Sequence, residues 1–172
     1  KVKLIEKRSH LGGQLKLAAS LGSKPEFAQL LDFFIDRLDR SGIELQLGRD
    51  FNLDALMEFR PDQIICATGS VPRPLYLDGK LQQEVHQAVE ILENHTALAG
   101  KVVVIGGAIT GLDTADFLSK QGAHVTIIEA GKQSGSGLEW YLRKMRLKAL
   151  RDAGVKILVQ FQVAQVQRGF VV

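Results

Sequence analysis

The hydrophobic pattern divides this chain into short apolar runs that predict strands and longer amphipathic stretches that predict helices. The clearest helix begins at Pro25, because the apolar residues after it recur at the i, i+3, i+4 and i+7 spacing of one helical face and Gly42 suits its end. Runs that predict strands lie at residues 2–6, 43–47, 62–69, 102–105, 125–128 and 155–159. Further helices are expected at residues 85–92, 109–121 and 138–152.

Strands and helices alternate in the second part of the chain in the order β-α-β-α-β. Such alternation with short loops requires parallel strands joined by right-handed crossovers. We therefore predict a doubly wound, Rossmann-like α/β fold. The proline-containing connector at residues 70–79 divides it into two partial lobes, which we place at residues 1–78 and 79–172.

Composition limits the setting and the partners. The 172 residues include 22 Lys and Arg against 19 Asp and Glu, and the resulting net charge of +3 is scattered along the chain, so nothing indicates a nucleic-acid partner. No apolar run approaches the roughly 18–20 residues of a membrane span, and the charged start lacks the apolar core of a signal peptide. We expect a cytoplasmic protein with neither a nucleic-acid nor a membrane partner.

The stretch VVVIGGAITG, residues 102–111, predicts a buried strand that runs into a glycine turn and then a helix. A turn of this kind lets a pyrophosphate approach bare backbone and the free amides at a helix N-terminus. Gly106, Gly107 and Gly111 fit that requirement, whereas Ala108 stands where the middle glycine is usual. We expect the alanine methyl to weaken dinucleotide binding by ~1–2 kcal/mol without abolishing it.

Glu129 follows the glycine turn at about the 20-residue spacing that places an acid on the adenosine ribose. A carboxylate there accepts a hydrogen bond from the 2′-hydroxyl of NADH and repels the 2′-phosphate of NADPH, so we predict a preference for NADH. Lys132 is the one nearby cation that could reduce this preference. The alternative is a tight strand-to-helix turn that binds nothing.

The other chemically interesting side chains predict no catalytic or metal site. The histidines are dispersed without metal-ligand spacing and are expected on the surface or in loops: His10, His86, His95 and His124. Cys66, the only cysteine, lies in an apolar run and is expected to be a buried, inert thiol.

The helix expected at residues 138–152 combines basic and apolar side chains. We interpret its cations as a solvated face, with a docking role as the alternative: Arg143, Lys144, Arg146, Lys148 and Arg151. The expected buried stripe beneath them consists of Leu142, Met145 and Leu150. Trp140 and Tyr141 are expected to pack near the start of this helix rather than to stack on a ligand ring.

Three segments, VKLIEKRSHLGGQL, DQIICATGSVPRP and KVVVIGGAITGLDTADFLSKQGAHVTIIEA, together resemble the nucleotide-binding part of the NADH:flavin oxidoreductases related to 2,4-dienoyl-CoA reductase and trimethylamine dehydrogenase. The resemblance covers nearly the whole chain. It implies one Rossmann-like domain for FAD or ADP, a second for the nicotinamide cofactor, and a flavin-bearing barrel domain as partner in the parent chain.

The resemblance also implies roles for individual residues. Glu6 matches the acid that holds the adenosine ribose of FAD or ADP, and the matching loop and turn on that side are Gly12, Gly13, Gln14, Ala67, Thr68 and Gly69. On the NADH side the matching residues are Gly106, Gly107, Gly111 and Glu129. Asp113 stands where the family usually carries glutamate.

Compared with that family, the sequence lacks the first glycine turn, the barrel and the final strands. It looks like an excised piece of a longer enzyme. We therefore expect the isolated chain to bind FAD poorly or not at all and to be inactive, although the parent is expected to be an NADH:flavin oxidoreductase.

Two functions remain open on the sequence. The first is a domain that binds NADH and passes hydride equivalents to a flavin in the parent enzyme. The second is a module whose ADP, held on the Glu6 side, is structural. A plain NAD-dependent dehydrogenase is less well supported, because no tyrosine-lysine or histidine catalytic set is evident.

Overall fold

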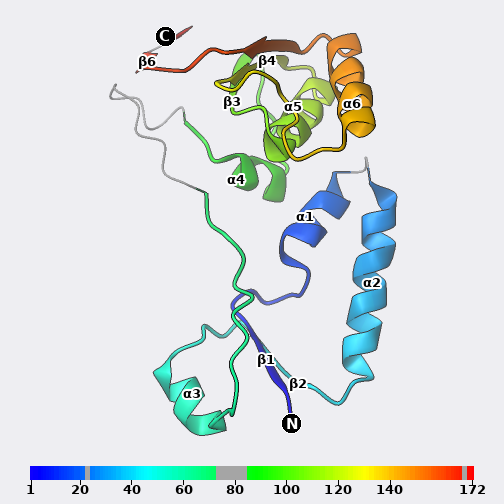
Figure 1. The fold of residues 1–172 in the computed structure, drawn as a ribbon, viewed down its shortest axis with the longest axis vertical. Coiled ribbons are helices and arrows are strands. Elements are labelled where there is room, and N and C mark those ends of the chain that lie inside the picture. The colour runs from blue at the N-terminus through cyan, green and yellow to red at the C-terminus, as the bar shows by residue number, and fades with distance from the viewer. Residues whose placement is uncertain (22–23, 73–84, 168–169) are drawn as a thin grey trace. The chain divides into compact units, whose positions relative to one another are not determined.

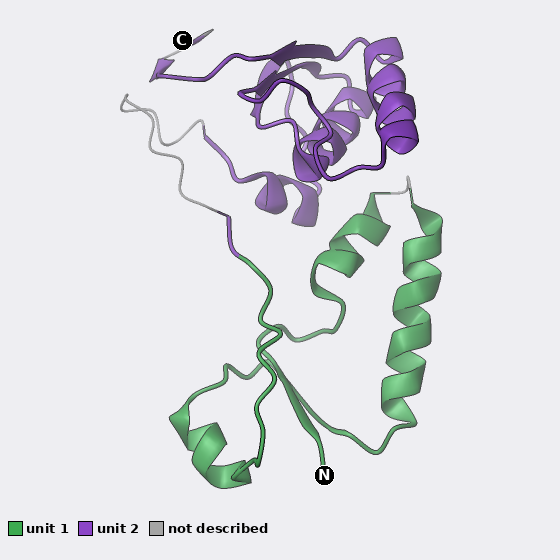
Figure 2. Cartoon of the chain, viewed as in Figure 1, with its two compact units in different colours: residues 1–70 green, residues 71–172 purple. Residues whose placement is uncertain are grey.

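The computed structural model describes residues 1–21, 24–72, 85–167 and 170–172. These residues form two compact units, Lys1–Ser70 and Val71–Val172 (Figure 2). The boundary predicted between residues 78 and 79 lies outside the described residues. Among the helices of the described part, none combines the length and the apolar character that crossing a membrane requires.

Unit 1 is built on two parallel strands, β1 (Lys3–Glu6) and β2 (Glu44–Leu47), as the pattern predicted (Figure 1). Between them the chain forms α1 (Gly13–Ser20) and α2 (Pro25–Asp39), which pack on each other. Pro25 opens α2 in a position where its missing N–H costs nothing. The register pairs Glu6 with Leu47, so both strands end at the same edge.

Two helices of unit 1 differ from the prediction. Gly13 and Gln14, expected in a loop, are the first residues of α1; Gly12 precedes them with φ 109°, a conformation that only glycine adopts readily. The sequence pattern did not predict α3 (Leu53–Phe59), which is only seven residues long. Its start is fixed by the side chain of Asn52, which accepts a hydrogen bond from the backbone N–H of Ala55 at 2.9 Å.

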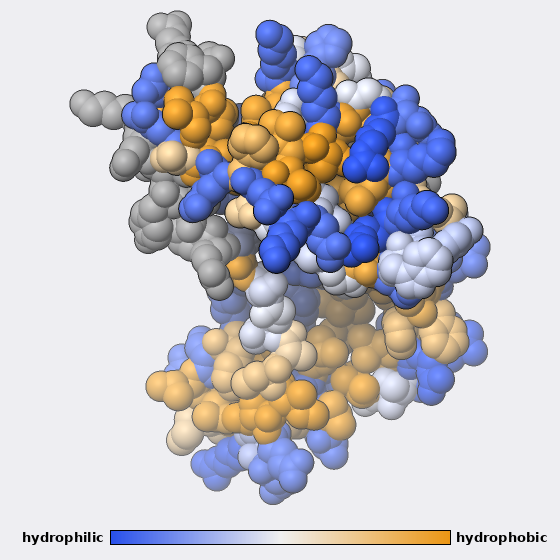
Figure 3. All heavy atoms as spheres, turned by 45° about the horizontal axis from the view of Figure 1, so that its top comes forward, coloured by the Kyte–Doolittle hydropathy of each residue, from blue (hydrophilic) through white to orange (hydrophobic). Residues whose placement is uncertain are grey.

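Residues 62–69 form no strand in the structure, and the prediction of one there was wrong. They enter no sheet among the described residues, so the side chain of Ile65 is left 90% exposed. Cys66 is likewise exposed rather than buried, because the apolar run that carries it has no strand to pair with. Figure 3 shows hydrophobic side chains at several places on the surface. Among the exposed hydrophobic residues of unit 1 are Leu30, Phe33 and Phe34 of α2.

Unit 2 is organised around a parallel sheet with the order β3-β4-β5, formed by Lys101–Ile105, His124–Glu129 and Lys156–Val159. The crossovers are α5 (Ile109–Lys120) and α6 (Trp140–Asp152), so the predicted β-α-β-α-β order is confirmed. A shorter helix, α4 (Ala88–Glu93), precedes the sheet and covers only part of the expected range 85–92. A small antiparallel pair follows, β6 (Val166–Gln167) and β7 (Phe170–Val171).

The core of unit 2 lies between one face of the sheet and α5. Val104, Val125 and Ile127 pack there with Leu112 and Leu118 of the helix, and all five are at most 7% exposed. Alternate residues of the strands, such as Val103 and Ile105, are more than a third exposed. Burial therefore alternates along β3, as expected for a strand in a sheet that is covered on one face.

Helix α6 packs differently from the prediction. Leu150 is buried as expected, but Leu142 and Met145 are each 53% exposed. Arg146, predicted on a solvated face, instead donates a hydrogen bond to the buried carboxylate of Asp113 on α5. The contact with Asp113 thus places Arg146 against α5 instead of on a solvated face.

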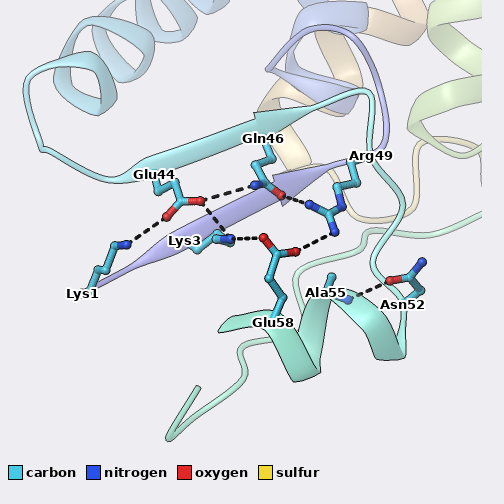
Figure 4. A network of polar contacts seen from close by, with 8 residues as sticks. All are labelled: Lys1, Lys3, Glu44, Gln46, Arg49, Asn52, Ala55 and Glu58. Carbon is cyan, nitrogen blue, oxygen red and sulfur yellow. Dashed lines mark hydrogen bonds and ion pairs between the residues drawn. The ribbon is translucent and has the colours of Figure 1, made fainter. Parts of the chain in front are cut away.

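A network of charged side chains connects β1, β2 and α3 in unit 1 (Figure 4). The Lys3 ammonium group, with only 6% of its side chain exposed, lies 2.9 Å from Glu44 and 5.1 Å from the centre of the Phe59 ring. Arg49 bridges Glu58 and Gln46, at 3.0 and 2.9 Å. Hydrogen bonds from Lys3 and then Lys1 hold the pKa of Glu44 below its usual value of 4.5.

The lowered pKa of Glu44 predicts an acid-sensitive contribution to stability. Because the folded-state pKa lies below the unfolded-state value, the contribution is present above pH 4.5 and is lost as the pH falls through the folded-state pKa. We expect the difference in urea midpoint between the natural chain and Glu44→Gln to shrink on acidification through that range. Parallel midpoint curves for the two proteins would contradict this origin.

The ion pair between Asp113 and Arg146 is expected to contribute strongly to the stability of unit 2. Arg146→Met leaves a buried carboxylate without its guanidinium partner and is expected to lower the free energy of unfolding by about 2–4 kcal/mol. The exposed pair Lys148–Asp152 on the same helix supplies the control, since Lys148→Met is expected to change it by less than about 0.5 kcal/mol. Chemical denaturation followed by circular dichroism measures both, and equal losses would refute the assignment.

Candidate nucleotide-binding site

Three chain segments meet at the carboxyl edge of the sheet in unit 2. The glycine turn follows β3, Glu129 is the last residue of β4, and Gln160 follows β5. The parallel register aligns Ile105 with Ile128 and Glu129 with Val159, which brings the three strand ends together. In open parallel sheets this edge is where ligands bind.

The first and last glycines of the turn are required by geometry. Gly106 has φ 98°, and its N–H donates to the carbonyl of Ile128 at 2.8 Å, which holds the turn to β4. A Cβ atom on Gly111 would collide with the carbonyl oxygen of Gly106 and would lie 3.0 Å from the Gly106 carbonyl carbon. Helix α5 therefore approaches the turn as closely as a dinucleotide-binding turn requires.

Both carboxylate oxygens of Glu129 accept backbone N–H groups, and one of these belongs to the second glycine of the turn. One oxygen accepts a hydrogen bond from the N–H of Gly107 at 2.7 Å, and the other accepts from the N–H of Gly131 at 2.6 Å. The carbonyl of Gly107 also accepts from the N–H of Gly135 at 2.6 Å. The sequence placed these residues near one another, but it gave no sign that the acid binds the turn directly.

Ala108 is the N-cap residue of α5, with an ordinary extended backbone (φ −75°, ψ −175°) and an exposed side chain. No side chain caps this helix, and among the described residues the amides of Ala108, Ile109 and Thr110 form no hydrogen bond. These amides and the helix dipole make the end of α5 suitable for an anion. The alanine fits the turn without backbone strain.

Ser134 and Lys132 both lie in the loop after β4. Ser134 is 1% exposed, and its hydroxyl has no hydrogen-bond partner in the part of the chain that the structure describes. It lies so close to Gly107 that a Cβ atom there would collide with its oxygen, a packing role the sequence did not predict. Lys132 is exposed and forms no ion pair among the described residues.

The residues matched to the flavin side all belong to unit 1. Glu6 ends β1 and accepts a hydrogen bond from the N–H of Arg8 at 2.7 Å. Gly12 packs against Leu31 of α2, and Gln14 donates to the hydroxyl of Ser70 at 3.4 Å. Because Ser70 follows Ala67, Thr68 and Gly69 (φ 71°), the structure brings the start of α1 to the end of that segment.

Other candidate positions lie apart from the turn. A depression in unit 2 is lined by Val102, Val125, His124 and other residues, none of which belongs to the turn or is Glu129. No cluster of metal-ligating side chains occurs in the described ranges. Trp140 and Tyr141, expected to be packed, contact each other edge to face and are 65% and 55% exposed.

The sequence is similar to that of several curated relatives, but only over part of their length. The chain is 35% identical over 130 residues to an NADH oxidase from Thermoanaerobacter brockii, a match that covers 73% of this chain and 20% of the relative. It is 34% identical over 129 residues to a cinnamate reductase from Clostridium sporogenes, covering 75% and 19% respectively. The chain thus spans about a fifth of these relatives.

The fold is also similar to that of a solved 2-naphthoyl-CoA reductase in complex with 2-naphthoyl-CoA, with a TM-score of 0.90 and 25% identity. That match covers 99% of this chain and 26% of the reductase chain. The family model described as pyridine nucleotide-disulphide oxidoreductase matches residues 1–170. The chain therefore belongs to the pyridine nucleotide-disulphide oxidoreductase family.

Proposed function

We propose that unit 2 is the NADH-binding part of a larger flavin-dependent oxidoreductase. The observation that carries the proposal is the rigid connection between the glycine turn and Glu129, which places an acid beside unpaired amides at the start of α5. The family and the names of the relatives support a nicotinamide cofactor, since one of them is an NADH oxidase.

The residues of this turn fit a dinucleotide. The space that a Cβ atom on Gly111 would fill is already occupied by the backbone of Gly106, so the helix end lies close to the turn. The amides of Ala108, Ile109 and Thr110 would then donate to the pyrophosphate. Glu129 would accept hydrogen bonds from the adenosine ribose, because a carboxylate oxygen that already accepts one N–H retains further acceptor capacity.

When bound, the nicotinamide supplies hydride to an acceptor, which in the parent enzyme we take to be a flavin. The role of this chain is to bind and orient the cofactor.

Three further proposals rest on the sequence. They are that the Glu6 side binds FAD or ADP, that the chain docks to a flavin-bearing barrel domain, and that the setting is cytoplasmic. A structural ADP module is the second candidate, and the geometry around Glu6, Gln14 and Ser70 is the observation in its favour.

The first test is calorimetric titration of the purified chain with NADH, NADPH, ADP and FAD at one salt concentration. We expect saturable NADH binding that is tighter than NADPH binding, and little or no FAD binding. Ala108→Gly is expected to tighten NADH binding about tenfold, because it removes the methyl beside the phosphate path. Binding of ADP alone would favour the structural module, and binding of no nucleotide would refute both functions.

A second test concerns the specificity of Glu129. Glu129→Gln removes the negative charge and one of the two accepted hydrogen bonds, so the Kd for NADH is expected to rise about tenfold. NADPH binding should be unchanged or tighter, since the repulsion of its 2′-phosphate is gone. The decisive measurement is the ratio of the Kd for NADPH to the Kd for NADH. General loosening of the fold would weaken the binding of both cofactors and leave this ratio unchanged.

The matched control is Glu6→Gln. Glu6 makes the same contact in unit 1, where it accepts the N–H two residues further on, yet it lies outside the proposed NADH site. The Glu6→Gln substitution should leave the dissociation constants for NADH and NADPH unchanged. An unaltered ratio in Glu129→Gln would refute the ribose assignment.

A further inference from the structure

The backbone bends sharply immediately after β5. Gln160 has φ 61°, a left-handed conformation that is uncommon for residues other than glycine, asparagine and aspartate. A strained residue of this kind persists only where its surroundings hold it, and such residues concentrate at functional sites. Here the N–H of Gln160 donates to the carbonyl of Gly131 at 3.0 Å.

The bend connects the next residue to the proposed ribose acid. The N–H of Phe161 donates to the carbonyl of Glu129 at 3.2 Å, so the backbone of Phe161 lies directly beside the end of β4. Two residues later, Val163 is 7% exposed and anchors the segment in unit 2. Phe161 is thus held at a defined position at the carboxyl edge of the sheet.

Packing within unit 2 does not account for the phenylalanine. Its side chain is 58% exposed, and it forms no aromatic pair among the described residues. The depression in unit 2 does not include it either. Phe161 thus presents an exposed aromatic ring on a doubly hydrogen-bonded segment next to Glu129.

We propose that Phe161 is the stacking surface for the adenine base of the bound nucleotide. This inference rests on the proposed function, because the adenine is attached to the same ribose that Glu129 is proposed to hold. A base stacks readily on an aromatic ring and does so with little dependence on its identity. Phe161 would therefore add affinity for every adenosine-containing ligand, while Glu129 selects between NADH and NADPH.

The test compares ligands with and without adenosine. We expect Phe161→Ala to raise the Kd for NADH and for ADP about tenfold and to leave binding of reduced nicotinamide mononucleotide unchanged. Phe161→Trp should bind NADH and ADP about as tightly as the natural chain does, because tryptophan retains an aromatic face for stacking. Tyr141→Ala is the matched control, since Tyr141 is 55% exposed in the same unit but lies outside the site.

The outcomes separate this inference from the proposed function. If the natural chain binds NADH and Phe161→Ala binds it equally well, the stacking role is wrong and the NADH site stands. If Phe161→Ala weakens the mononucleotide as much as NADH, the residue supports the fold and the stacking role is again wrong. If the natural chain binds neither NADH nor ADP, the proposed function fails and the adenine role with it.

Discussion

The arrangement of the site in unit 2 depends on a single residue, Glu129. Glu129 accepts the N–H of Gly107 from the turn after β3 and the N–H of Gly131 from its own loop, while its carbonyl accepts the N–H of Phe161 from the segment after β5. Three loops that carry no regular structure are thereby fixed to one residue. Charge-assisted hydrogen bonds are stronger than neutral ones, which suits an acid to this role.

Close packing around the turn then determines which residue types are possible. Gly111 has no room for a side chain because of the Gly106 carbonyl, and Gly107 has none because of Ser134 and Glu129. Ala108 differs, because its side chain is exposed and its backbone is extended. The position where the sequence departs from the usual glycine pattern is therefore the one whose side chain faces solvent, and the departure leaves the shape of the turn intact.

The sequence allowed the parallel αβ plan and the position of the turn to be predicted, because these depend on hydrophobic period and on glycine spacing. It failed at residues 62–69, where an apolar run indicated a buried strand although strand formation needs a partner. It also misassigned Leu142 and Met145, which are exposed, because helical spacing alone does not show which side of a helix a neighbouring element covers. The contact of Arg146 with Asp113 could not be predicted, because the two residues are distant in the sequence. No sequence signal pointed to Phe161, because the role proposed for it rests on backbone hydrogen bonds to residues distant in the chain.

Both units contain a strand-ending glutamate whose carboxylate binds backbone N–H groups, but the number of these contacts differs. Glu6 and Glu129 each end a parallel strand and each accept the N–H two residues further on, at 2.7 and 2.6 Å. In unit 2 the second carboxylate oxygen also reaches a glycine turn, whereas among the described residues the Glu6 carboxylate accepts no second hydrogen bond. An acid held only by its own loop is oriented, but it is not connected to a phosphate-binding turn. The physical case for a nucleotide site is accordingly stronger in unit 2, and for that reason the nicotinamide cofactor is the ligand that this chain is proposed to bind by itself.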